Sequence, residues 1–125
     1  MKTDLVEIFQ TIRASLQPYA ASGFTARTNT DTAYELWSEK NVDVNGAPQT
    51  EIYFAGVLIN DGSVTFKLRP IKEDASLKNL LHENLLALLS DEYSFNITAL
   101  DENLMEKIND TIVIGFTNYK QKGWV

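Results

Sequence analysis

Three carboxylates near the end of the chain have the spacing of one helix face. Glu102, Glu106 and Asp110 follow one another at steps of four residues, and residues four apart lie above one another on an α-helix. An oxygen-rich stripe of this kind can ligate a hard cation or ferrous iron. Lys107 lies beside the stripe, however, and acidic residues early in a helix are favoured by the helix dipole without any metal. We therefore favour a solvated helix face and keep the metal site as the alternative.

A second candidate site combines cations and aromatic residues in segments that have the pattern of β-strands. Lys67 and Arg69 alternate with apolar residues and should point outward from their strand. If the sheet curves around a cavity, these two cations would bind an anion, and Tyr34 and Trp37 would line the cavity. The favoured alternative is a solvated sheet face, with the aromatic residues in core or edge positions. Further candidates for the same cavity are Arg13, Arg27 and Tyr53.

Chemistry that depends on cysteine or histidine has little support. The chain contains no cysteine, which excludes thiolate nucleophiles, disulfides and cysteine-ligated zinc. The only histidine, His82, lies in a leucine-rich segment and is expected to be an exposed helix residue. No Gly-x-Ser-x-Gly sequence and no glycine-rich phosphate loop is present, so no nucleophile elbow or nucleotide motif is predicted. An enzyme would have to work with carboxylates, tyrosines or an arginine, and we do not expect one.

Length and charge limit the classes of function further. The 125 residues suit a single domain over residues 1–125, and 44% of them are hydrophobic, as in ordinary globular proteins. The formal charge of −6 disfavours binding to nucleic acid or to an anionic membrane surface. The N-terminal segment has no continuous apolar stretch, so we expect neither a secretory signal nor a membrane span and predict a cytoplasmic location.

The hydrophobic pattern predicts an α+β fold. A mixed or antiparallel sheet of about five strands should carry an N-terminal helix, a leucine-rich helix and a long C-terminal helix, because strands precede most of the helices instead of alternating with them. The strand over residues 51–59 is almost continuously apolar and is expected to be covered on both faces. The expected helices span residues 3–17, 77–89 and 101–122, and the expected strands span residues 24–28, 33–38, 51–59, 63–69 and 93–98.

Turn and cap residues mark the ends of these elements. The sequence Asn45 to Pro48 and the sequence Asn60 to Gly62 predict hairpin turns, because glycine tolerates positive φ and proline cannot extend a ladder. Thr3 is the expected cap of the first helix, and Asp101 and Gly123 are the expected start and stop of the last.

Two apolar features leave packing alternatives open. The leucines between residues 77 and 89 occupy more than one helix face, so this helix is either buried on two sides or contacts a second subunit in a homodimer. Trp124 lies next to the end of the sequence, and an indole is costly to leave in water. It should therefore dock within the chain or at a dimer contact.

Residues 54–70, from Phe54-Ala-Gly-Val through Asn-Asp-Gly to Leu-Arg-Pro70, resemble the central hairpin of the YdhG-like family of small bacterial proteins. Phe95 to Ile97, Leu100 to Glu102 and the segment from Gly115 to Trp124 are similar to the strand and closing helix of that family. The resemblance covers residues 51–125 and only weakly the first fifty. It implies an α+β domain of unassigned function in most members, with an iron-chaperone role compared to frataxin proposed for some.

These observations together lead to one expectation of function and one alternative. The expectation is a cytoplasmic binding or interaction domain without catalytic machinery or cofactor, with a small molecule or a protein as its partner. The alternative is a frataxin-like iron-binding chaperone that uses surface carboxylates, with Glu102, Glu106 and Asp110 as its ligands.

Overall fold

The computed structural model describes residues 1–125 and contains a five-stranded sheet in which every neighbouring pair is antiparallel. The strand order is β1-β2-β5-β6-β7, so strands that follow one another in this sheet are also neighbours in space. The expected α+β class with an antiparallel sheet is confirmed. The strands are β1 (Thr25–Asn29), β2 (Ala33–Ser38), β5 (Ile52–Asn60), β6 (Ser63–Leu68) and β7 (Ser94–Ile97).

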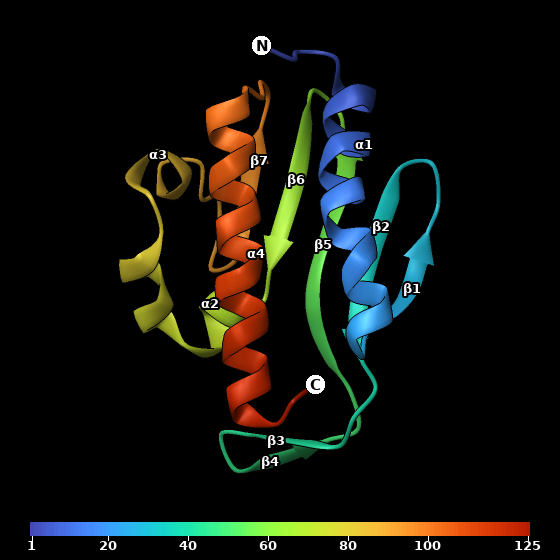
Figure 1. The fold of residues 1–125 in the computed structure, drawn as a ribbon, viewed down its shortest axis with the longest axis vertical. Coiled ribbons are helices and arrows are strands. Elements are labelled where there is room, and N and C mark those ends of the chain that lie inside the picture. The colour runs from blue at the N-terminus through green and yellow to red at the C-terminus, as the bar shows by residue number, and fades with distance from the viewer.

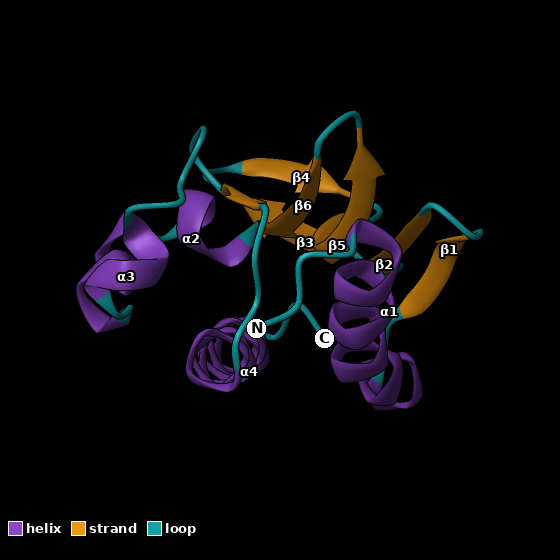
Figure 2. Ribbon diagram, turned by 90° about the horizontal axis from the view of Figure 1, so that it is seen from above, coloured by secondary structure: helices purple, strands orange, loops and turns teal.

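Both long helices lie on the same face of this sheet (Figure 2). They are α1 (Leu5–Leu16), which continues into the 3-10 turn η1 (Gln17–Ser22), and α4 (Glu102–Lys122). Their apolar stripes and the helix-facing side of the sheet, together with buried residues of the short helices and loops, form a cluster of 26 buried residues. No helix lies over the opposite side of the sheet (Figure 2), which we call the open face.

The ends of the long helices are set by local side-chain caps. Asp101 accepts a hydrogen bond from the amide of Leu104 at 2.7 Å, and Gly123, with φ 73°, ends α4, as the sequence predicted. At α1 the cap is Asp4, which accepts from the amide of Glu7 at 3.0 Å. The expected cap Thr3 is one residue too early, since Asp4 occupies the capping position and Asp is the stronger N-cap residue of the two.

The leucine-rich segment does not form the continuous helix that the leucine spacing predicts. It is divided into α2 (Pro70–Glu73), η2 (Ala75–Leu80) and α3 (Glu83–Leu86). Asp74 accepts a hydrogen bond from the amide of Ser76, and His82 has extended backbone and accepts at Nδ1 from the amide of Asn84. Each of these local bonds starts a new turn, which competes with helix continuation. His82 is therefore exposed, as expected, but it is a cap and not a mid-helix residue.

The short pieces pack beside α4 at the β7 edge of the sheet (Figure 1). Leu77, Leu81 and Leu85 are buried there, whereas Leu80 is 64% exposed. One side of the segment is thus buried within the chain and the other faces outward, because the breaks turn successive leucines in different directions.

A second, two-stranded sheet lies at the end of the molecule near the C-terminus (Figure 1). It pairs β3 (Val42–Val44) with β4 (Ala47–Gln49) through a turn in which Asn45 and Gly46 have φ 53° and 85°. The predicted turn is confirmed, since these residue types accept left-handed backbone. It joins two short strands, however, instead of leading directly into β5.

A β-bulge in β5 decides which side chains reach each face of the sheet. Leu36 pairs with Ala55 and Trp37 pairs with Tyr53, so Phe54 is an extra residue without a partner on β2. Phe54 and Ala55 consequently both belong to the buried cluster, and Tyr53 turns to the open face. The expectation that β5 is covered on both faces is confirmed for residues 52–57, which are all buried: helices cover one face, and on the other Tyr53 packs between the rings of Trp37 and Tyr93.

The C-terminal tryptophan docks within the chain. Trp124 is 8% exposed, and its ring meets that of Tyr119 at 5.1 Å in an edge-to-face arrangement. Its carbonyl accepts a hydrogen bond from the buried Ser38 hydroxyl at 2.5 Å. Of the two alternatives for Trp124, the intramolecular contact is the one that this structure contains.

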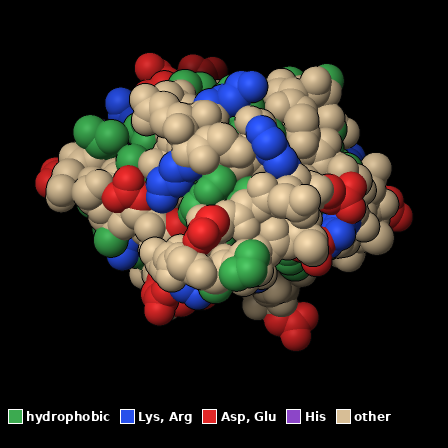
Figure 3. Space-filling view, turned by 90° about the horizontal axis from the view of Figure 1, so that it is seen from below, with side chains coloured by type: hydrophobic (Ala, Val, Ile, Leu, Met, Phe, Trp, Pro, Cys, Tyr) green, Lys and Arg blue, Asp and Glu red, His purple; other side chains and the backbone are tan.

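The surface is mixed in character. Figure 3 shows the end of the molecule seen from below, where Lys and Arg are interspersed with Asp and Glu and hydrophobic side chains form small separate areas. None of the helices combines the length and the apolar character needed to cross a bilayer. Charges of both signs that are mixed in this way create no strong local field at this end of the molecule.

One buried hydrogen bond joins α4 to β5 and provides a test of the packing. The Tyr119 hydroxyl donates to the carbonyl of Tyr53 at 2.7 Å. We expect Tyr119→Phe to lower the free energy of unfolding by about 1 kcal/mol, because the carbonyl loses a buried donor. Tyr19→Phe is the matched control, since the Tyr19 hydroxyl makes no side-chain hydrogen bond, and should change stability little. Urea denaturation of both variants checks this, and equal losses would contradict it.

Candidate ligand-binding site

The open face carries a polar row across four strands. Glu35 of β2 is opposite Gly56 of β5, Gly56 is opposite Lys67 of β6, and Lys67 is opposite Ser94 of β7. Residues directly opposite one another in antiparallel strands share a face and have neighbouring side chains. The row therefore places a carboxylate, a gap at glycine, an ammonium group and a hydroxyl side by side.

An aromatic row lies next to it. The rings of Trp37 and Tyr53 meet at a centroid distance of 5.2 Å and an interplanar angle of 88°, and Tyr53 meets Tyr93 at 6.4 Å and 61°. These edge-to-face contacts are favourable beyond the area that they bury. Trp37 and Tyr93 are half-buried, whereas Tyr53 between them is only 6% exposed. The row thus forms an apolar strip on a face that no helix covers.

Tyr53 links the two rows because its hydroxyl lies on the backbone of Gly56. A β-carbon at Gly56 would overlap the Tyr53 hydroxyl and come within 3.0 Å of the Glu35 Cγ atom, so only glycine fits under this ring. The Tyr53 hydroxyl is buried and lies beside the Glu35 carboxylate. Burial first, and then the negative charge of Glu35, raise the pKa of Tyr53 far above its ordinary value. Tyr53 is therefore a neutral hydroxyl at any physiological pH.

Arg27 closes one side of the aromatic row. Its guanidinium group lies 5.0 Å from the ring centroid of Trp37 and pairs with Glu39 at 3.0 Å and with Glu51. A hydrogen bond from Thr25, followed by those from Arg27, lowers the pKa of Glu39. This arginine is already held by two carboxylates and a ring, so it forms a fixed edge of the face.

Arg69 and Lys72 border the other side of the aromatic row. Both lie within 6 Å of the Tyr93 ring, at 5.8 and 5.9 Å. Arg69 pairs with Glu73 at 2.8 Å, and Lys72 pairs with Glu92 at 3.8 Å. As at Arg27, the charge of each cation has a carboxylate partner.

Lys67 differs from these three cations because it forms neither an ion pair nor a side-chain hydrogen bond. It is half-buried, and Ser94, which is opposite Lys67 across the ladder, is 3% exposed and has its buried Oγ beside the Asp91 carboxylate. Asp91 nearby accepts from the amides of Tyr93 and Ser94 at 2.9 and 2.8 Å. The hydrogen bond from the Tyr93 amide is the main cause that lowers the pKa of Asp91, and the charge of Lys67 adds to it.

The structure brings together some of the predicted ligand-binding residues and separates others. Trp37 and Lys67 share the open face, with Arg69 at its rim. Tyr34 is on the helix-covered side, where it is 3% exposed within the core. Burial raises the pKa of Tyr34, and the charge of Arg13 opposes this. A single cavity lined by all four predicted residues therefore does not form.

The predicted acidic stripe exists on α4 but does not converge. Glu102, Glu106 and Asp110 are all exposed on successive turns, as the four-residue spacing indicated. No group of three or more His, Cys, Asp or Glu side chains in the protein is arranged to hold a metal ion. Iron binding by this stripe stays a prediction.

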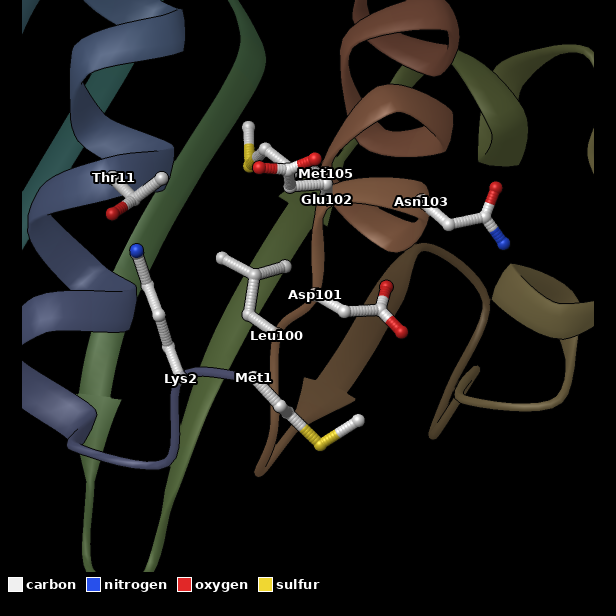
Figure 4. Close-up of a pocket in the computed structure, with 8 residues that line it drawn as sticks. All are labelled: Met1, Lys2, Thr11, Leu100, Asp101, Glu102, Asn103 and Met105. Atoms are coloured by element: carbon white, nitrogen blue, oxygen red, sulfur yellow. The ribbon is translucent and has the colours of Figure 1, made fainter.

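A cavity of about 560 Å³ lies between the N-terminal segment and the start of α4 (Figure 4). Lys2 and Thr11 lie on one side of it, and the Asp101 and Asn103 side chains point to the other side (Figure 4). Lys2 already pairs with Glu7 at 3.5 Å, and Asp101 caps α4. Since Lys2 and Asp101 are already engaged and the polar side chains do not converge on one point, this cavity is a weaker candidate than the open face.

Sequence reasoning missed Gly56 and Ser94 as neighbours of Lys67, and Glu35 and Tyr93 as further parts of this face. Strand alternation places Tyr53 and Gly56 on opposite faces, and the bulge at Phe54 reverses this. The glycine inside an otherwise apolar strand was the one available signal, because such a glycine often marks a bulge or a close approach.

The contact between Tyr53 and Gly56 can be tested by a double-mutant cycle. We expect Gly56→Ala to lower the free energy of unfolding by about 1 to 3 kcal/mol, because the new methyl group overlaps the Tyr53 hydroxyl. Tyr53→Phe removes the hydroxyl that this methyl group would meet and keeps the ring contacts with Trp37 and Tyr93. In the Tyr53→Phe background the cost of Gly56→Ala should fall. Additive effects in urea denaturation would contradict the arrangement.

The comparisons with known proteins give no match. No protein-family model matches the sequence, and neither a curated protein nor a solved structure is similar to it. The resemblance to YdhG-like proteins thus stays a prediction, and what can be said of function rests on the geometry above.

Proposed function

We propose that this protein is a non-enzymatic binding domain that holds a small planar ligand on the open face of its sheet. The observation that carries the proposal is the row of rings from Trp37 through Tyr53 to Tyr93 on a face without a helix. Aromatic strips with a few polar groups beside them are typical of small-molecule sites. A ring of the ligand would pack on the exposed parts of Trp37 and Tyr93.

The groups on the open face suit binding better than proton transfer. Tyr53 stays protonated because burial raises its pKa, so it can donate a hydrogen bond but does not act as a base near neutral pH. The histidine that could shuttle a proton, His82, caps α3 and is not part of the sheet. With no cysteine in the chain, the face has no thiolate nucleophile.

Fixed cations at both ends of the aromatic row support the proposal. Arg27 and Arg69 each pair with a carboxylate and lie over a ring. Side chains held in this way lose little freedom when a ligand binds, so the cost of ordering the site is low. The open face is thus largely formed before a ligand arrives.

The two tryptophans allow a direct test with benzoate and benzamide as probes. In Trp124→Phe the remaining Trp37 reports on the open face, and in Trp37→Phe the remaining Trp124 reports on the helix-covered side of the sheet, where it packs on Tyr119. We expect a saturable change in tryptophan emission with at least one probe in the first variant and none in the second. Millimolar affinity is usual for fragments of this size. No change in either variant with either probe would refute the proposal.

The iron-binding alternative has less support, because the carboxylates of α4 do not converge. Anaerobic ferrous titration by calorimetry distinguishes the small-ligand proposal from the iron-binding alternative. We expect no saturable binding to the parent protein and the same heat with Glu102→Gln/Glu106→Gln. Saturable binding that the double variant abolishes would favour the iron chaperone.

A further inference from the structure

We infer that a second copy of this chain binds to the outer side of α4, so that two α4 helices pack in antiparallel orientation across a two-fold axis near Val113. In Figure 1, α4 runs between α1 on one side and α2 and α3 on the other, and no segment of the chain lies over its outer side (Figure 1 and Figure 2). This surface is on the helix-covered side of the sheet. The inference therefore goes beyond the ligand site proposed on the open face and does not depend on it.

The outer side of α4 has opposite charges at its two ends and an apolar residue at its centre. Glu102, Glu106, Val113 and Lys120 are all exposed, and we call these four residues the outer ridge. Steps of four and seven residues keep their side chains on one line along an α-helix. The two glutamates occupy the first half of α4 and the lysine lies in its last turn. The outer ridge thus changes sign at Val113.

None of the charges on α4 has an ion-pair partner within the chain. All ion pairs of the structure lie outside this helix, at Lys2, Arg27, Arg69 and Lys72. The helix dipole by itself favours acidic residues at the start of a helix and basic residues at its end. The apolar residue between them is a separate observation, because the dipole gives no reason to expose a valine.

Two exposed apolar side chains lie together near the midpoint of α4. Val113 is 52% exposed and Leu80 of η2 is 64% exposed, and they are two of the four large hydrophobic side chains that the structure leaves exposed. Both line a hollow of about 280 Å³ between η2 and α4. On its other side Val113 lines a hollow of about 420 Å³ that α4 forms with α1 and η1. A second copy would remove both side chains from water, which favours association.

The charges of the outer ridge select one orientation of the second copy. In a two-fold dimer the same patch occurs on both sides of the contact. Parallel α4 helices would place Glu106 beside Glu106 and Lys120 beside Lys120, and like charges across an interface are costly. Antiparallel helices with the axis at Val113 place Glu106 opposite Lys120, because each lies seven residues from Val113. The symmetry repeats this ion pair at both ends, and Leu80 meets Leu80 beside the axis.

The surface is large enough for a reversible dimer. With 21 residues, α4 is about 30 Å long. Since neighbouring helices pack about 10 Å apart, α4 and the elements on its two sides span roughly 20 Å. A patch of these dimensions corresponds to the lower end of specific interfaces, roughly 600 Å² per partner. Exposed ion pairs contribute little affinity, so we expect a dimer that dissociates on dilution.

Sedimentation equilibrium over about a hundredfold range of protein concentration tests the inference. We expect the parent to shift from monomer toward dimer as the concentration rises. Val113→Asp should raise the dissociation constant at least about tenfold, because it removes the apolar centre and brings two like charges together at the axis. Val6→Asp is the matched control and should leave the dissociation constant unchanged. Val6 is 53% exposed and helical, and it lies nine residues before Ser15, which lines the hollow beside α4, and so on the opposite side of α1.

Charge reversal tests the orientation. Glu106→Lys and Lys120→Glu should each weaken the dimer, because each places like charges together at both ends of the contact. The variant with both substitutions has opposite charges at these positions again and should recover most of the parent's affinity. Both residues are exposed, so these substitutions should leave folding intact, which circular dichroism checks.

Three results would count against the inference. A parent that stays monomeric at every concentration would overturn it, and so would a dimer that Val113→Asp leaves intact. A double charge variant that associates no better than the single ones would overturn the antiparallel pairing. None of these results affects the ligand site, because that site is tested by probe binding to the open face.

Discussion

The arrangement of this protein depends on one extra residue in the middle strand of its sheet. The bulge at Phe54 lets two consecutive residues, Phe54 and Ala55, enter the core and turns Tyr53 to the other face. Phe54 then stacks on Phe24 at 4.2 Å, and the carbonyl of Tyr53 accepts the buried hydrogen bond from Tyr119 of α4. Residues 53–55 therefore contact the core, the closing helix α4 and the open face, because a bulge redirects side chains without interrupting the sheet.

The two faces of the sheet are stabilised by different interactions. The helix-covered face buries a continuous apolar cluster, which supplies the main driving force for folding. The open face stabilises itself through rings, ion pairs and a tyrosine that lies over Gly56. The buried hydroxyls of Tyr53 and Ser94 lie there beside the carboxylates of Glu35 and Asp91.

Much of the fold could be predicted from local signals. The alternation of Val64, Phe66 and Leu68 identified β6, and the Asn60 to Gly62 turn identified its hairpin with β5. Capping by Asp101 and Gly123 bounded α4. The prediction of one continuous helix in the leucine-rich segment was wrong. The leucine spacing suits a helix, but Asp74 and His82 accept hydrogen bonds from the backbone two residues onward and start new turns. Short side-chain bonds of this kind outweigh periodicity.

The candidate site also combines features that a single strand or helix predicts with features that depend on contacts between elements. The sequence by itself determined that Lys67 points away from the apolar residues of its strand and that the last helix carries an acidic stripe, because both follow from the repeat of a single element. Only the tertiary structure decided that Tyr34 is buried under the helices and that Tyr53, Gly56, Lys67 and Ser94 are neighbours. That neighbourhood depends on strand register and on the bulge at Phe54, which are set by packing between strands distant along the chain and leave no periodic trace in the sequence.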